Sequence, residues 1–224
     1  MKRIFKRVSA AVMALAVAAT AVVFDVPGKI IAAATADHTN HAVCGDTSCT
    51  EHTTISDWTG ISDFNSVSSG NYYLTADVAL TDQVTINAKT DITLCLNGHT
   101  ITAASNNRIL NVTGGSITLC DCKGTGKLTG GNSEDYGGGV NVSNGTFTMY
   151  GGTISDNTST RGGGGGVYVS NGTFTMYGGT ISGNTSRTVG GGVYAIGSSS
   201  FTMYGGTISG NTARTVGGGV YQGD

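Results

Sequence analysis

A cluster of histidine and cysteine side chains near the N-terminus is the first group with metal-binding chemistry. It comprises His38, His41, Cys44, Cys49 and His52. Imidazole nitrogens and thiolates are the usual ligands of a tetrahedral Zn²⁺ site, which makes a zinc centre one interpretation. The spacing matches no standard zinc finger. The N-terminal residues indicate export, as argued below, and exported chains favour disulfides. The alternative interpretation is therefore a Cys44–Cys49 disulfide or an unstructured tail. No cofactor is expected elsewhere in the chain.

Three further cysteines, Cys95, Cys120 and Cys122, lie in the middle of the chain. Leu94-Cys95 and Leu119-Cys120 align in successive copies of a repeat, so stacked copies would bring the Cα atoms of Cys95 and Cys120 to about 4.8 Å. That separation is within disulfide reach. Strand alternation puts both thiols on the outer face, where a stack of thiols is the alternative to a bond. The chain has five cysteines, so at least one stays outside any disulfide of a monomer.

Tyrosine recurs at the spacing of the same repeat and forms two predicted columns. One contains Tyr150, Tyr177 and Tyr204, and the other contains Tyr168, Tyr194 and Tyr221. Exposed aromatic rows can stack sugar rings or contact a protein partner, which makes both columns candidate ligand-binding sites. The alternative is structural, because tyrosine favours β-sheet and packs well against its own copy on the next strand.

Arginine forms a third predicted column, of Arg161, Arg187 and Arg214, at a corner of the repeat. Like charges in a column repel one another modestly, and an anion or an acidic glycan would relieve that repulsion. Simple solvation of the three guanidinium groups is the alternative.

Catalytic groups are sparse in the repeats. Lyases and glycosidases act through clustered carboxylates, and from residue 137 onward the only acids are Asp156 and Asp224. Glu134 and Asp135 are adjacent, so in a strand they would point to opposite faces. His99 lies in a predicted turn without a nucleophile beside it. We therefore do not expect an enzyme; the alternative is a carbohydrate-active enzyme, a polysaccharide lyase or glycosidase, whose catalytic coils lie beyond residue 224.

These side chains are positioned by a repeat of about 27 residues. The sequence of residues 145–155 recurs unchanged at 172–182 and closely at 199–209. A Gly-Gly-Gly-Val block also recurs, and its valines, Val140, Val167, Val193 and Val220, are spaced by 27, 26 and 27 residues. Each repeat holds three short alternating segments separated by turns rich in glycine and asparagine. This pattern predicts an all-β fold, a right-handed parallel β-helix with three strands per coil.

Alternation divides each coil into an inside and an outside. In one coil it places Val167, Val169, Phe174, Met176 and Ile181 inside, and Tyr168, Thr173, Thr175 and Tyr177 outside. Stacking then predicts ladders of identical residues. Asn157, Asn184 and Asn211 each follow a core isoleucine by three residues, so they predict a hydrogen-bonded asparagine ladder at a corner.

The repeats set the expected domain boundaries. Residues 70–224 are read as coils, degenerate at first, and the array is expected to be truncated at its C-terminus. Residues 37–54 are the Cys/His-rich segment. Residues 55–69 predict an N-terminal cap, a short helix or irregular turn, because Ile55, Trp58, Ile61, Phe64 and Val67 recur every third residue. Such a cap would cover the exposed edge and core of the first coil.

Residues 1–36 have the order of a secretory signal peptide. A start rich in lysine and arginine precedes an apolar run from Val8 to Phe24, and Ala-x-Ala sites follow. The run is too short for a membrane anchor, so we expect a secreted or cell-surface protein with no membrane span after cleavage. Removal of the peptide leaves seven basic and thirteen acidic residues, 7 − 13 = −6. This charge argues against nucleic acid as a partner.

The Gly-Gly-Gly-Val block and Ile181-Ser182-Gly183-Asn184 resemble the repeats of polymorphic outer-membrane proteins. Residues 71–74 and 94–101 are similar to the opening of secreted β-helix proteins of Gram-positive gut bacteria. The resemblance implies a β-helix displayed at a bacterial surface, where it would act in adhesion by binding a glycan or a protein. The Thr-x-Thr pairs at 146–148 and 173–175 also look like the ice-binding face of β-solenoid antifreeze proteins, although a threonine ladder is ordinary sheet chemistry. The oligomeric state is not indicated.

Overall fold

The computed structural model describes residues 24–26, 29–31 and 58–224 of the chain. It divides into two compact units, Met1–Thr35 and Ala36–Asp224. In the first unit, β1 (Phe24–Val26) pairs antiparallel with β2 (Lys29–Ile31). In the second unit, residues 58–224 form the β-helix. No helix in the described part of the chain is long and apolar enough to cross a membrane.

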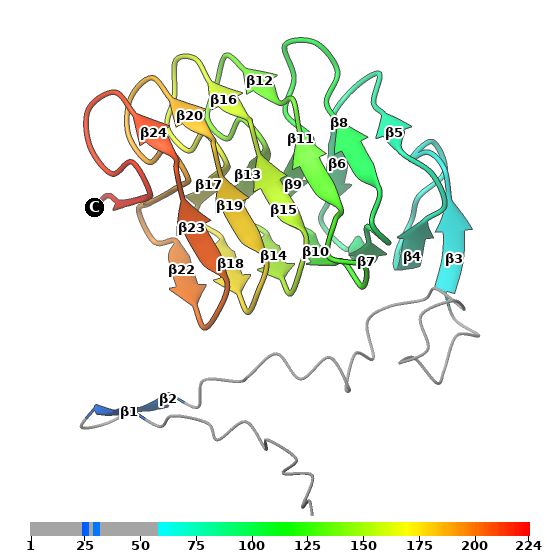
Figure 1. The fold of residues 1–224 in the computed structure, drawn as a ribbon, viewed down its shortest axis with the longest axis horizontal. Helices are drawn as coiled ribbons and strands as arrows, with labels where there is room; N and C mark the ends of the chain where they lie inside the picture. Colours follow the sequence, from blue (N-terminus) through cyan, green and yellow to red (C-terminus); the bar gives the residue numbers. More distant parts are fainter. Residues whose placement is uncertain (1–23, 27–28, 32–57) are drawn as a thin grey trace, which may run out of the picture. The chain divides into compact units, whose positions relative to one another are not determined.

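Four parallel sheets run along the β-helix, and from β4 onward consecutive strands of the chain belong to different sheets (Figure 1). Sheet 1 contains β3 (Trp58–Ile61), β4 (Gly70–Leu74), β7 (Asp91–Cys95), β10 (Ser116–Cys120), β14 (Thr146–Met149), β18 (Thr173–Met176) and β22 (Ser200–Met203). Sheet 2 contains β5 (Val78–Ala79), β8 (Thr100–Thr102), β11 (Lys127–Thr129), β15 (Thr153–Ser155), β19 (Thr180–Ser182) and β23 (Thr207–Ser209).

The other two sheets complete each coil. Sheet 3 contains β6 (Val84–Asn87), β9 (Leu110–Thr113), β13 (Val140–Ser143), β17 (Val167–Ser170), β21 (Val193–Ile196) and β25 (Val220–Gln222). Sheet 4 contains β12 (Asn132–Ser133), β16 (Thr158–Ser159), β20 (Thr185–Ser186) and β24 (Thr212–Ala213). The right-handed parallel β-helix is confirmed. Sheet 4 adds a two-residue strand at one corner, inside a segment that sequence patterning assigned to a turn.

The core is a set of ladders of identical side chains. Phe147 pairs in register with Phe174, and Phe174 with Phe201. Their ring centroids are 4.9 and 5.0 Å apart. Phe147 and Phe174 are fully buried, whereas Phe201 in the last described coil is half-buried. Burial follows the predicted alternation because each coil covers the apolar face of its neighbour and cannot cover its own.

The Gly-Gly-Gly-Val block is a corner that no larger residue fits. The first glycine of each block has a positive φ, 71° at Gly164 and 61° at Gly190. The second approaches the next coil closely: a Cβ on Gly165 would lie 2.5 Å from the carbonyl oxygen of Gly191. An L-residue is strained at the first position and clashes with backbone at the second. Backbone geometry at these corners therefore accounts for much of the glycine in the chain.

The asparagine ladder is confirmed. Asn157 and Asn184 are fully buried beside the core. The backbone N–H and the Nδ2 of Asn157 both donate to Oδ1 of Asn184, at 3.0 Å each. Asn184 donates in the same way to Oδ1 of Asn211, at 3.0 and 2.9 Å, and its Nδ2 also donates to the carbonyl of Ile154 at 2.9 Å. The side chain of Asn184 thus satisfies a backbone N–H and a backbone carbonyl of the preceding coil.

Only some of the residues in the predicted cap, residues 55–69, cover the end of the core. Trp58–Ile61 is strand β3 of sheet 1, not a helix, and it pairs in parallel with β4. Ile61, Phe64 and Val67 pack against the end of the core, as a cap requires. Trp58 packs instead with Cys95 and Cys120, in a separate cluster from that core. Ile55 lies outside the described residues.

Candidate functional site

The outward side chains of sheet 1 form a hydroxyl-rich surface over three coils. Thr146, Thr173 and Ser200 align in one column, and Thr148, Thr175 and Thr202 in a second. The tyrosines that follow the strands, Tyr150, Tyr177 and Tyr204, make a third. We call these nine residues the hydroxyl face. None of them is charged, and each carries a group that both donates and accepts hydrogen bonds.

The rings in the tyrosine column of this face are partly exposed to solvent. Tyr150, Tyr177 and Tyr204 keep 38%, 38% and 43% of their surface accessible. Centroids along the column are 4.7 and 5.1 Å apart, with interplanar angles of only 8° and 12°. Both faces of the Tyr177 ring are therefore covered by its neighbours, and a sugar cannot lie flat on it. The ring edges and the phenol hydroxyls remain for a ligand.

Burial within the stack also affects the protonation of the column. Desolvation raises the pKa of Tyr150 above its ordinary value, and the neighbouring phenol of Tyr177 raises it further. Near neutral pH the hydroxyl of Tyr150 is therefore protonated and can donate a hydrogen bond.

The second tyrosine column differs from the expected exposed row. Tyr168, Tyr194 and Tyr221 align in sheet 3 as predicted, but their rings are tilted by 51° and 40° and Tyr194 is only 8% exposed. Burial, and then the phenol of Tyr168, raise the pKa of Tyr194. Tyr168 and Tyr221 are half-exposed, so burial in this column is confined to Tyr194.

Tyr136 extends this column and was not predicted from the sequence. Its ring stacks on Tyr168 with centroids 4.5 Å apart, and it is 46% exposed. It stands just before a Gly-Gly-Gly-Val block, at a place where the next three coils carry Gly163, Val189 and Val216, so the repeat gave no aromatic signal there. The aromatic residue that breaks the repeat was the available clue.

The predicted arginine column is wrong in one of its three members. Ser159 pairs with Ser186, and the N–H of Arg187 donates to Ser159 as that of Arg214 donates to Ser186. Arg187 and Arg214 are therefore in register, whereas Arg161 lies one residue further along its coil. Nη2 of Arg161 lies 3.3 Å from Oε2 of Glu134, and both side chains are exposed. This corner has mixed charge and is not a cationic stripe.

The central cysteines lie where the tyrosine column of sheet 1 would continue. Cys95 pairs in register with Cys120 and with Tyr73, as expected from the repeat. Both thiols are buried, because Trp58 and Tyr73 pack over them outside the sheet. Sγ of Cys95 lies 3.6 Å from Sγ of Cys122, and Sγ of Cys120 lies 3.6 Å from the carbonyl oxygen of Leu94.

The predicted metal ligands His38, His41, Cys44, Cys49 and His52 lie outside the described residues, and so does the predicted Cys44–Cys49 bond. Within the described residues, no three histidine, cysteine or acidic side chains are grouped so that they could hold a metal ion.

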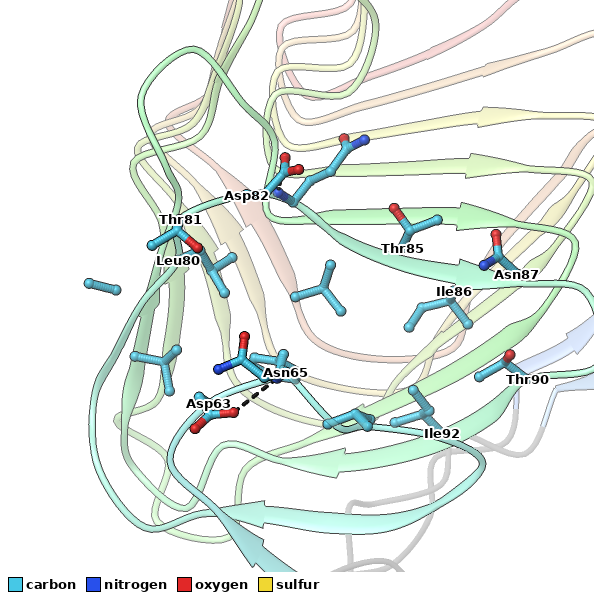
Figure 2. Close-up of a pocket in the computed structure, with 16 residues that line it drawn as sticks. Asp63, Asn65, Leu80, Thr81, Asp82, Thr85, Ile86, Asn87, Thr90 and Ile92 are labelled. Atoms are coloured by element: carbon cyan, nitrogen blue, oxygen red, sulfur yellow. Dashed lines mark hydrogen bonds between the residues drawn. The ribbon is translucent and has the colours of Figure 1, made fainter.

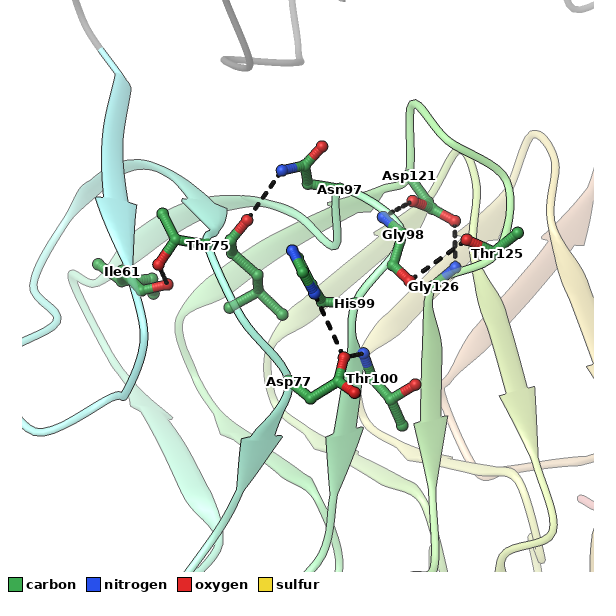
Figure 3. A network of polar contacts seen from close by, with 11 residues as sticks. Ile61, Thr75, Asp77, Asn97, Gly98, His99, Thr100, Asp121, Thr125 and Gly126 are labelled. Atoms are coloured by element: carbon green, nitrogen blue, oxygen red, sulfur yellow. Dashed lines mark hydrogen bonds and ion pairs between the residues drawn. The ribbon is translucent and has the colours of Figure 1, made fainter. Parts of the chain in front are cut away.

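The acids of the early coils hold turns together (Figure 3). Asp121 is buried and accepts from the backbone N–H groups of Gly98 and Gly126, at 2.7 and 2.6 Å. Asp77 accepts from the N–H of Thr100 at 2.9 Å and lies 3.3 Å from Nδ1 of His99. These contacts are sufficient to explain both carboxylates as structural groups.

The Asp77 carboxyl should titrate below its ordinary value of about 3.9. The hydrogen bond from the N–H of Thr100 is the largest cause of the lowered pKa, and His99 is the next. Stabilisation by Asp77 is therefore present above its unfolded pKa and is lost as the pH falls through its folded pKa. In carboxyl NMR titrations, His99→Ala should raise the pKa of Asp77 only part of the way. Full recovery of the ordinary value would contradict this order of causes.

A cavity of about 370 Å³ lies between residues 63–67 and the first complete coil (Figure 2). Leu80, Ile86 and Ile92 contribute apolar walls, and Asp63 and Asp82 bring carboxylates from different turns. Asp63 accepts from the N–H of Asn65, and Asp82 from Nδ2 of Asn107. The cavity is the end of the core below the partial cap, and no pattern in the sequence indicated it.

Comparison of the chain with protein-family models, with curated proteins and with solved structures found no match. The candidate binding surface is the hydroxyl face, a neutral, periodic array of hydroxyl groups on sheet 1.

Proposed function

We propose that this chain is a secreted or surface-displayed binding module whose hydroxyl face takes an extended, uncharged glycan. The observation that carries the proposal is the in-register arrangement of two Thr/Ser columns beside the exposed Tyr150, Tyr177 and Tyr204 column. No charged side chain interrupts the residues 145–155, 172–182 and 199–209 that build this surface.

The chemistry of the face suits a neutral saccharide better than an anion. Each phenol and alcohol can donate one hydrogen bond and accept others, as sugar hydroxyls do. The same set of groups recurs about every 4.8 Å along the β-helix, so an extended polymer can repeat one contact from coil to coil. An acidic glycan would need cations, and Arg187 and Arg214 lie at the corner of sheet 4. Export, which the N-terminal sequence supports, would place the face outside the cell.

A glycan array probed with the exported chain tests the ligand class. We expect binding to neutral polysaccharides with little change between low and high salt, because no charge pair contributes. Binding restricted to sulfated or uronic-acid glycans, and lost at high salt, would instead favour the arginine corner. Binding to protein surfaces without any glycan signal would also contradict the proposal.

Replacing Tyr177 by phenylalanine should weaken binding of the best array hit about 2- to 10-fold, the loss of one hydrogen bond. The phenyl ring keeps the stack, so the free energy of unfolding should stay nearly constant. Tyr177→Ala also removes the stacking contacts and should lower stability by about 1 kcal/mol. Calorimetric titration and denaturant melts separate the two effects.

Tyr194→Phe is the matched control, because Tyr194 is buried and lies in sheet 3, outside the hydroxyl face. Its affinity should equal that of the unmodified chain. Unchanged affinity in both Tyr177 variants would leave the exposed column as scaffold only.

A further inference from the structure

We propose that Cys95 and Cys122 are joined by a disulfide that links two successive coils. This site is independent of glycan binding, and it replaces the Cys95–Cys120 pairing that strand register alone suggests. The inference rests on where the structure places the three sulfur atoms and on how far each is buried.

The sulfur contact indicates Cys122 as the partner. Sγ of Cys95 lies 3.6 Å from Sγ of Cys122, in direct contact. Cys120 is the residue beside Cys95 on the adjacent strand, and its thiol donates to the carbonyl oxygen of Leu94. Cys122 follows the end of β10, where the chain turns, and its Sγ also contacts Oδ1 of Asn97 at 3.7 Å. Formation of the bond shortens the sulfur–sulfur contact from 3.6 Å to about 2.0 Å.

Burial sets the order in which the thiols react. Cys122 is partly exposed, whereas Cys95 is fully buried under Trp58 and Tyr73. The oxidant is a disulfide, either a small one such as oxidised glutathione or that of a thiol–disulfide oxidoreductase. The Cys122 thiolate attacks one of its sulfurs and releases the other as a thiolate, which leaves a mixed disulfide on Cys122.

The second step closes the bond inside the protein. The Cys95 thiolate attacks Sγ of Cys122 and expels the remaining half of the oxidant. Two thiols lose two protons and two electrons, and the oxidant is reduced to two thiols. The aromatic cover that shields Cys95 then restricts the access of reductants to the finished bond.

The position of the bond fits the change in the outward column of sheet 1. From Tyr150 onward this column consists of stacked tyrosine rings. In the two coils before Tyr150, Cys95 and Cys120 occupy the corresponding positions. A bond from Cys95 to Cys122 spans 27 residues, one coil. It would tie β7 to the turn after β10, at the place where the ring stack is missing.

Mass mapping of the complete chain decides the connectivity. The purified chain is reduced, then oxidised in a buffer of oxidised and reduced glutathione, and digested without reduction. Trypsin cuts after Arg108 and separates Cys95 from Cys120, and Asp-N cuts before Asp121 and separates Cys120 from Cys122. We expect the main cross-linked product to join the Cys95 and Cys122 peptides. A Cys95–Cys120 link, a link from either residue to Cys44 or Cys49, or no link would overturn the proposal.

Two serine variants give an independent readout. Oxidation should raise the melting temperature of the unmodified chain and of Cys120→Ser by roughly 6 to 12 °C, as expected for closing a loop of this length. Cys122→Ser should show no such rise. If Cys122→Ser fails to fold, the mass map of the unmodified chain still decides. A rise that persists in Cys122→Ser and vanishes in Cys120→Ser would assign the bond to Cys120.

Discussion

Replacing Phe174 by alanine should lower the free energy of unfolding by about 3–5 kcal/mol. The ring is fully buried and stacks between Phe147 and Phe201, with centroids 4.9 and 5.0 Å away. Its removal loses the transfer free energy of the phenyl group and also leaves a cavity between two rings that belong to other coils. The coil backbones are held by hydrogen bonds on both sides, so they cannot close the gap fully.

Denaturant melts followed by circular dichroism measure this loss. Thr175→Ala changes the adjacent residue, which points outward, and should cost less than about 0.5 kcal/mol. Phe201→Ala should cost less than Phe174→Ala, because Phe201 is already half-exposed. A loss below 1 kcal/mol for Phe174→Ala would mean that the assignment of inside and outside is wrong.

Asn184→Ala should destabilise the β-helix by about 3 kcal/mol or more, although it removes few atoms. The side chain is fully buried and donates through Nδ2 to the carbonyl of Ile154 and to Asn211. Its Oδ1 accepts from both the backbone and the amide of Asn157. Alanine leaves the Ile154 carbonyl and the Asn157 N–H buried without these partners, and each such group costs about 1–3 kcal/mol.

Asn211→Ala provides the comparison within the same ladder. Asn211 is only half-buried, so water can replace part of what its side chain supplies, and the loss should be smaller. Equal losses at the two positions in denaturant melts would show that the ladder acts through local turn conformation. Hydrogen exchange at the Asn157 amide should quicken in Asn184→Ala if the coil-to-coil bond is what protects it.

The fold was predictable from the sequence because the repeat specifies each coil more than once. Phe147, Phe174 and Phe201 give the coil length, and the alternation around each of them gives its inner face. The asparagine ladder follows from the same spacing. These features depend on contacts between equivalent residues, and an aligned repeat displays such contacts directly.

The candidate site was less predictable, because it depends on register at corners and on contacts outside the repeat. Arg161 and Arg187 precede the valine of their glycine blocks by the same number of residues, which makes them look equivalent. Arg161, however, comes two residues after Ser159, whereas Arg187 comes directly after Ser186, the partner of Ser159. The structure follows the serines, because paired strands fix register and the glycine turn absorbs the missing residue. Trp58 and Tyr136 have no equivalents in other coils, so their packing was not encoded in the repeat.

The hydrogen bonds of the β-helix join residues about one coil apart, as between Asn157 and Asn184, which are 27 positions apart. A tandem duplication in the gene that inserts one whole repeat would therefore restore every contact it interrupts, since the new coil presents the same edges as the old. Selection can lengthen or shorten such a protein without first re-optimising its core. Mutations confined to the outward columns can then diversify the surface that each added coil presents.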